Sequence, residues 1–164
     1  MLGIVLDEAY LSMGYKSRHI WCLPRKDSTD HDCHVVNAVY SMRAKKWIMM
    51  DATNEAYFVD QKNAVVGLQE VRAWLRAGKQ VRLNKDANWN GKPLDSADHI
   101  RYMAKNVYEF QCGLRSEFGY DGKAGAKSYV YLLPNAEKGS HKGDLWVENG
   151  LYYTTNPRCF WAEP

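Results

Sequence analysis

The sequence of 164 residues has no long apolar run: nothing in it approaches the roughly 20 consecutive apolar residues that a transmembrane helix needs. We therefore predict no membrane span in this chain. Excess charge of one sign is also lacking, since the formal net charge is only +3 and Lys45-Lys46 is the only adjacent pair of lysines. Proteins that bind nucleic acids through the phosphates need a more concentrated positive surface, so no nucleic-acid partner is predicted.

Recognisable repeats and cofactor motifs are missing as well. The chain has no internal repeat and no glycine-rich phosphate loop, and we predict no cofactor. Its four cysteines follow no disulfide pattern, so they neither require nor exclude disulfides. The content of 46% hydrophobic and 25% charged residues is typical of a globular protein with a buried core. The length suits one domain, or one domain with an appendage.

The clearest positive pattern is a β-hairpin. Residues 34–40 form a strand rich in Val and Tyr, 43–46 are a basic turn, and 47–50 form an apolar strand. His34 opens the first strand and Asp51 follows the second. The start of one antiparallel strand lies beside the end of its partner, so we expect these two side chains to be neighbours. A carboxylate there fixes the imidazole tautomer, as a general base for a nucleophile requires, although both residues also suit ordinary polar strand ends.

A helix and a strand precede this hairpin. The helix is predicted over 2–13, because apolar residues recur at spacings of three and four, and Gly14 ends it. A strand over 18–23 and a polar loop follow. The apolar residues of the predicted helix are Leu2, Val5, Leu6, Ala9, Tyr10 and Met13.

The order of these pieces resembles the core of the transglutaminase-like superfamily, which shares a papain-like fold. The segments that carry the resemblance are Gly14-Tyr15-Lys16-Ser17-Arg18, His34, and Trp47-Ile48-Met49-Met50-Asp51-Ala52-Thr53. They span about the first 55 residues. The resemblance implies an α+β fold with a helix packed on an antiparallel sheet. It also implies acyl transfer by a thiolate, with His34 as base and Asp51 orienting it, on a protein or peptide substrate. The thioester would then undergo hydrolysis or transamidation.

The nucleophile is the point at which the sequence departs from the family. The family has its catalytic Cys at the start of the helix that here begins near Leu2, where free backbone N–H groups lower the thiol pKa. Only Met1 precedes that helix, so the resemblance implies an N-terminally truncated domain that is inactive as given. Cys22 is near enough in the chain to approach His34 across the sheet, but a buried structural thiol is favoured. Cys33 adjoins His34 and is expected on the opposite face of the strand. The other two cysteines are Cys112 and Cys159.

Two alternatives to this enzyme remain open. The first is a non-catalytic module on the same fold that binds a peptide or a glycan. The second is a metal-dependent hydrolase using the adjacent potential ligands Asp30, His31, Asp32, Cys33 and His34. Their spacing is not that of a zinc motif, so a solvated polar loop is favoured and we predict no metal.

These patterns divide the chain into three segments. The transglutaminase-like core occupies 1–60, a helix and connecting segment 61–94, and a C-terminal helix with β-hairpins 95–164. The middle segment contains a predicted helix over 66–77 and a short strand over 80–83. The third begins with Asp95 as the N-cap of a helix through about Phe110, whose apolar spacing indicates an amphipathic core helix without chemistry.

The remaining residues are predicted to be strands. They cover 111–118, 128–133 and a hairpin of 145–148 with 151–155, whose Asn149-Gly150 turn is typical of type I′. Aromatic residues alternate along these strands. Such residues bind sugars or bases in some proteins, but cross-strand packing is the favoured interpretation. The two bulky aromatic residues of the tail are predicted either to dock on the body of the domain or to continue into residues that this chain lacks.

Overall fold

The computed structural model describes residues 2–26, 32–120, 128–141 and 143–164. Its helices are α1 (Leu2–Ser12), α2 (Leu68–Arg76), α3 (Ser96–Asn106) and α4 (Pro157–Phe160), with a 3-10 turn η1 (Asn135–Lys138). The large sheet contains β1 (Ser17–Leu23), β2 (His34–Ser41), β3 (Lys46–Met50), β8 (Glu109–Gly113), β9 (Tyr129–Leu132), β10 (Trp146–Glu148) and β11 (Leu151–Thr154). Two short strand pairs are β4 (Phe58–Val59) with β5 (Arg82–Leu83) and β6 (Asn88–Trp89) with β7 (Lys92–Pro93).

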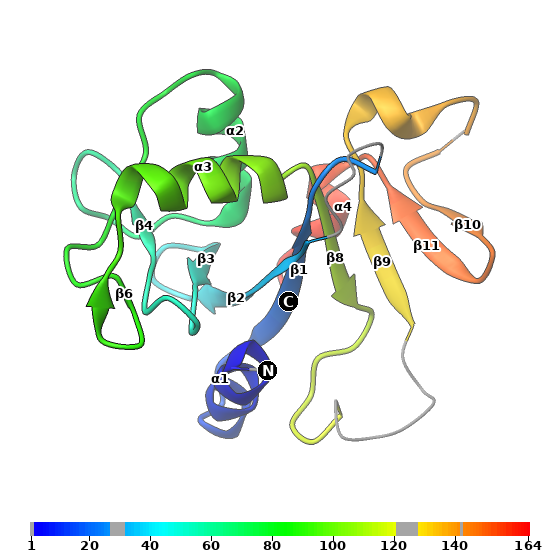
Figure 1. Ribbon diagram of the computed structural model, residues 1–164. Coiled ribbons are helices and arrows are strands. Elements are labelled where there is room, and N and C mark those ends of the chain that lie inside the picture. The colour runs from blue at the N-terminus through cyan, green and yellow to red at the C-terminus, as the bar shows by residue number, and fades with distance from the viewer. Residues whose placement is uncertain (1, 27–31, 121–127, 142) are drawn as a thin grey trace.

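The large sheet has seven strands in the order β10-β11-β9-β8-β1-β2-β3 (Figure 1). All of its pairings are antiparallel except that of β9 with β11, which is parallel. The predicted α+β class is confirmed at this level. The sheet unites strands from the first 50 residues with strands after residue 108, because β8 pairs with β1.

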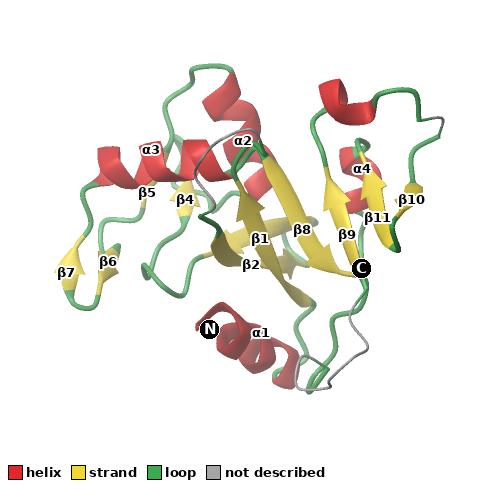
Figure 2. Ribbon diagram, turned by 45° about the vertical axis from the view of Figure 1, so that its right-hand side comes forward, coloured by secondary structure: helices red, strands yellow, loops and turns green. Residues whose placement is uncertain are grey.

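The two faces of the sheet are covered by different helices. Figure 2 shows the sheet between α1 on one side and α2 and α3 on the other. Strand alternation places Cys22, His34 and Val36 on the face toward α2 and α3, and Val35 and Asn37 on the face toward α1. The main core lies on the first of these faces. Its buried members include Ile20, Val36, Met49, Phe58, Val71, Met103, Phe110, Leu132 and Phe160.

Polar contacts and one close approach fix α1 on its face of the sheet. The Asn37 side-chain amide donates to the Gly3 carbonyl at 2.8 Å, and a Cβ on Gly3 would lie 3.0 Å from Val35 Cγ1. The buried Asp7 carboxylate accepts a hydrogen bond from the Ser17 hydroxyl. The predicted helix is confirmed, although several of the apolar residues whose spacing predicted it are exposed. Leu2, Val5 and Met13 are 53 to 65% exposed, since the short and polar side of α1 fits the sheet more closely.

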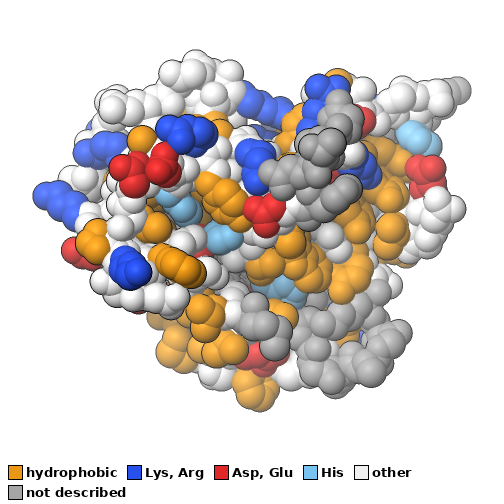
Figure 3. All heavy atoms as spheres, in the orientation of Figure 1, with side chains coloured by type: hydrophobic (Ala, Val, Ile, Leu, Met, Phe, Trp, Pro, Cys, Tyr) orange, Lys and Arg blue, Asp and Glu red, His pale blue; other side chains and the backbone are white. Residues whose placement is uncertain are grey.

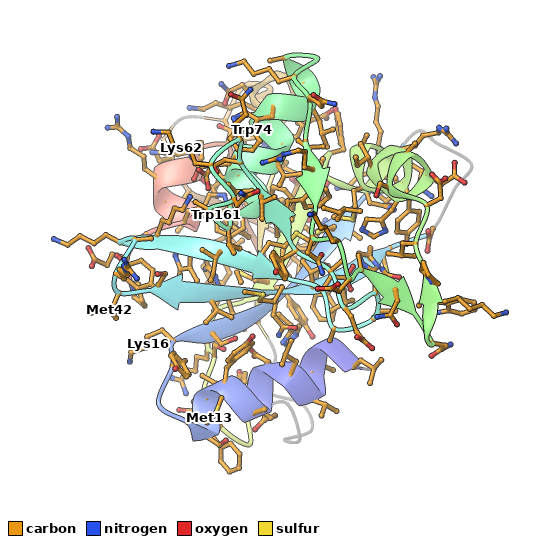
Figure 4. All side chains as sticks on the ribbon, turned by 90° about the vertical axis from the view of Figure 1, so that its left-hand side faces the viewer. Met13, Lys16, Met42, Lys62, Trp74 and Trp161 are labelled. Atoms are coloured by element: carbon orange, nitrogen blue, oxygen red, sulfur yellow. The ribbon has the colours of Figure 1, made fainter. Side chains whose placement is uncertain are left out.

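Helix α2 begins where it meets β3. A Cβ on Gly67 would overlap the Trp47 carbonyl oxygen, so only glycine allows this approach. The Glu70 carboxylate accepts from the Gly67 N–H at 2.9 Å and forms an ion pair with the Lys46 ammonium at 2.8 Å. These contacts attach the helix to the β2–β3 hairpin. Figure 4 shows this hairpin with Met42 at its tip.

The C-terminal elements agree with the sequence in part. Asp95 caps α3 as predicted, since its carboxylate accepts from the Asp98 N–H at 2.9 Å. The helix ends at Asn106 and not near Phe110, because 109–113 pair as β8 between β1 and β9. The Asn149-Gly150 hairpin is confirmed, with φ of 50° and 78° at the two residues. Phe160 of the tail is buried.

Membrane-spanning helices are absent from the part of the chain that the structure describes. None of the helices there combines the length and the apolar character needed to cross a bilayer.

Candidate functional site

His34 and Asp51 meet in space, as the hairpin predicts. His34 Nε2 lies 2.6 Å from Asp51 Oδ2, and the two side chains are 9% and 0% exposed. The register that aligns Asn37 with Met50 leaves Asp51 just beyond the end of β3, diagonally across from His34 on the same face of the sheet. The predicted proximity is therefore confirmed, while a catalytic role for the pair remains a proposal.

The Asp51 carboxylate is held by several donors. Its Oδ1 accepts from the backbone N–H groups of Thr53 and Asn54 at 3.0 and 3.2 Å. Its Oδ2 accepts from the Asn54 side-chain amide at 2.8 Å in addition to His34. Burial alone would raise the pKa of Asp51, but the hydrogen bonds and the positive potential of His34 outweigh burial and lower it. The carboxylate is thus ionised at neutral pH and holds the proton of His34 on Nε2.

The other ring nitrogen of His34 is the one available for chemistry. Nδ1 makes no hydrogen bond within the described part of the chain, and it is accessible to solvent. The Tyr102 ring packs edge-on against the imidazole at a centroid distance of 5.3 Å. With Nε2 protonated and facing a carboxylate, Nδ1 is the basic nitrogen.

A second histidine, His99 of α3, also faces Asp51. Its Nε2 lies 3.9 Å from Asp51 Oδ2 and is buried without a hydrogen-bond partner among the described residues. Its ring stacks on Phe58 at a centroid distance of 6.2 Å. Burial lowers the pKa of His99 more than the nearby Asp51 raises it, so this imidazole is neutral at pH 7. The apolar spacing of α3 predicted a core helix without chemistry, and the only available signal of a site was a histidine among its apolar positions.

Asp32, at the end of the polar loop, ties the start of β2 to α3. The Lys105 ammonium lies 3.3 Å from Asp32 Oδ2. Burial and a hydrogen bond with Asp32 raise the pKa of Tyr102, which keeps the phenol neutral. Asp30 and His31 of the predicted metal alternative lie outside the described residues. Among the described residues, no group of three or more His, Cys, Asp or Glu side chains is arranged to hold a metal ion.

The cysteines do not supply a nucleophile for His34. Cys22 is paired with His34 across β1 and β2, but its side chain is fully buried and burial raises its thiol pKa strongly. Cys112 is buried beside the Arg18 guanidinium, at 3.7 Å. Cys33 and Cys159 are exposed. The favoured interpretation of Cys22 as a structural thiol agrees with its burial.

The other segments that carry the family resemblance are 14–18 and 47–53. Arg18 places its guanidinium 4.3 Å from the centre of the Trp47 ring and donates to the Phe160 carbonyl at 2.8 Å. Gly14 ends α1 with φ of 82°. The first turn of α1 contacts Val35, next to His34, but from the opposite face of the sheet. A thiol ahead of α1 would have to reach round the end of β2 to meet Nδ1.

Two further surface features are separate from this pair. A pocket of about 640 Å³ is lined by Trp74 and Lys62 and contains neither His34 nor Asp51 (Figure 4). The aromatic strands carry a row of stacked rings, with centroid distances of 4.8 to 6.0 Å. Because their faces lie against one another, packing is favoured over sugar binding. The row consists of Tyr131, Tyr153, Trp146 and His141.

Comparison of the chain with family models, with curated proteins and with solved structures found no match.

Proposed function

We propose that His34 and Asp51 are the acid–base pair of a thiol-dependent acyl-transfer site of the transglutaminase-like kind. The observation that carries the proposal is the 2.6 Å contact of His34 Nε2 with a buried, ionised carboxylate. In this site Nδ1 removes the proton of a thiol, and the thiolate attacks the carbonyl carbon of an amide. The imidazolium then protonates the leaving amine as the C–N bond breaks, which leaves a thioester. Water or a second amine resolves the thioester.

The nucleophile in this proposal comes from a position ahead of α1. The first turn of α1 contacts Val35, the neighbour of His34, from the other face of the sheet, so the placement requires the thiol to reach round the end of β2. Free N–H groups at a helix start stabilise a thiolate. None of the four cysteines in the sequence occupies that place, so we propose that the chain as given does not catalyse the reaction.

A cysteine scan at the start of α1 tests the proposal. The starting chain carries Cys33→Ser and Cys159→Ser, which removes the two exposed thiols. Single cysteines are then placed at Leu2 or one to three residues ahead of Met1, and the rate of iodoacetamide alkylation is measured from pH 4 to 9. We expect one position to react in mildly acidic solution, as a thiolate paired with an imidazolium does.

The dependence on His34 and Asp51 is the decisive control. His34→Gln and Asp51→Asn should return the reactive thiol to the behaviour of an ordinary cysteine with a pKa near 8.5. His141→Gln is the matched control, because His141 is an exposed histidine stacked on Trp146. If no inserted cysteine reacts faster than a thiol in the unfolded chain, the acyl-transfer proposal is wrong.

A further inference from the structure

A second site lies at the other end of α3, where the carboxyl end of β1, α2 and α3 surround a pocket of about 370 Å³. This volume is within the range of small-molecule sites. Four of its lining residues are cationic: Arg25, Arg72, Arg76 and Lys105. Figure 3 shows Lys and Arg side chains gathered in the upper part of the molecule, over α3 and around it. The rest of the lining is mainly apolar, with Leu75 and Val107 among its residues.

Arg72 is the most unusual residue of this pocket. It is only 8% exposed, and its guanidinium packs 4.7 Å from the centre of the Phe110 ring. Its only hydrogen bond in the described part of the chain is a long one, from Nη1 to the Tyr108 carbonyl at 3.4 Å. It forms no ion pair with a described residue. Each of its side-chain nitrogens that lacks a hydrogen-bond partner among the described residues is accessible to solvent. Arg72 is thus a buried cation with solvent-accessible donors, and it is one of the residues that line the pocket.

The charges around Arg72 are predominantly positive. Arg76 lies one helical turn further along α2, and like Arg72 it has no ion pair within the described residues. Burial and the neighbouring Arg76 lower the pKa of Arg72 to about 10, which leaves it charged at neutral pH. The nearby carboxylates have other partners, since Asp32 pairs with Lys105 and Glu137 accepts from the Tyr108 hydroxyl at 2.7 Å.

We propose that this pocket binds an oxyanion, a carboxylate or a phosphate group, carried on a small molecule with an apolar part. A buried charge without a partner is strongly unfavourable, and an arginine fork matches the paired oxygens of either group. Arg72 binds the anion, Arg76 adds a second cation at the exposed rim, and Leu75 with Val107 contacts the apolar part. This inference does not rest on the proposed function of His34.

Three probes distinguish the chemistry of the ligand. Phenyl phosphate, benzoate and benzyl alcohol share one ring and differ in the charged group. Their dissociation constants are measured with the intact chain by calorimetry at low ionic strength, with inorganic phosphate as a fourth probe. We expect phenyl phosphate or benzoate to bind at least about ten-fold more tightly than benzyl alcohol, because charge-assisted hydrogen bonds give that discrimination. The tighter of the two identifies the natural headgroup, and equal, weak binding of all three would overturn the proposal.

Three variants assign the binding to this pocket. Arg72→Met keeps an unbranched apolar side chain but removes the guanidinium, and it should weaken the binding of the anionic probe about ten-fold or more. Arg76→Met should weaken it less. Arg101→Met is the matched control, since Arg101 is an exposed arginine of α3 paired with Asp98, and it should leave the dissociation constant within about two-fold. Unchanged binding in Arg72→Met would overturn the proposal.

The stability of the free variants separates a ligand site from a structural arginine. If Arg72 serves an anion, Arg72→Met without ligand should have a midpoint of thermal unfolding equal to or above that of the parent chain, because an unpaired buried charge has been removed. A structural role predicts a lower midpoint in Arg72→Met and no response of the parent chain to the anionic probes. Should Arg72→Met fail to fold, the exposed Arg76→Met variant still decides: the proposal requires weaker anion binding in it than in Arg101→Met.

Discussion

Asp51→Asn tests the geometry of the candidate site in a chain that needs no added nucleophile. The new side-chain amide would still offer an oxygen to the two backbone N–H groups that now bind Oδ1. Its nitrogen would face His34 Nε2 and Asn54 Nδ2, which both bind Oδ2 in the parent chain. Two hydrogen bonds to a buried charge are thus lost or reversed, and we expect the free energy of unfolding to fall by about 2–4 kcal/mol.

The substitution should also move a proton on the neighbouring imidazole. In the parent chain the carboxylate holds a proton on His34 Nε2. An amide N–H facing the same nitrogen favours the tautomer with the proton on Nδ1. Long-range nitrogen–proton NMR spectra of the imidazole distinguish the two tautomers. The same change would remove the basic nitrogen on which the proposed chemistry depends.

Urea unfolding with Asp98→Asn as control completes this test. Asp98 is exposed and pairs with the exposed Arg101, so its substitution should change the free energy of unfolding by no more than about 0.5 kcal/mol. The folded-state pKa of Asp51 is lowered, so its contribution is present above the unfolded value of about 3.9 and is lost as pH falls through the folded value. The deficit of Asp51→Asn should therefore shrink in acid. An equal effect of both variants, or an unchanged tautomer, would refute the reasoning.

Three other predictions use the same chain. The parent chain should lose stability as pH falls below about 6.5, because the folded-state pKa of His99 is lowered and the unfolded chain takes up the proton first. His99→Gln should make this loss of stability smaller, and urea unfolding midpoints from about pH 5 to 8 measure the difference. Gly67→Ala should lower the free energy of unfolding by about 1–3 kcal/mol, since a Cβ would overlap the Trp47 carbonyl oxygen, and a cost no greater than that of an exposed Gly→Ala change would contradict the close approach. A disulfide reagent should modify Cys33 and Cys159 in the folded chain and the two buried thiols only after unfolding, as thiol counts with and without denaturant will show.

Local patterns were sufficient for much of the first half of the fold. The β2–β3 hairpin and the contact of His34 with Asp51 follow from two adjacent strands and a short turn. The cap of α3 and the Asn149-Gly150 turn likewise depend on residues close in the chain. The apolar spacing of α1 predicted the helix but not the face that it buries, because side-chain periodicity carries no information about the close approach of Gly3 to Val35.

The sequence by itself therefore determined the helix α1, the β2–β3 hairpin, the cap of α3 and the pairing of His34 with Asp51, because each is set by neighbours within about 20 residues. Only the tertiary structure placed β8 between β1 and β9, since no local signal specifies a pairing across some 90 residues. That pairing ends α3 at Asn106 and sets the helix across the sheet. As a consequence His99 reaches Asp51 at one end of α3, and at the other Arg72 loses solvent without gaining a counter-ion among the described residues. Both results depend on which side chains become buried by elements distant in the chain, and local sequence patterns do not specify this.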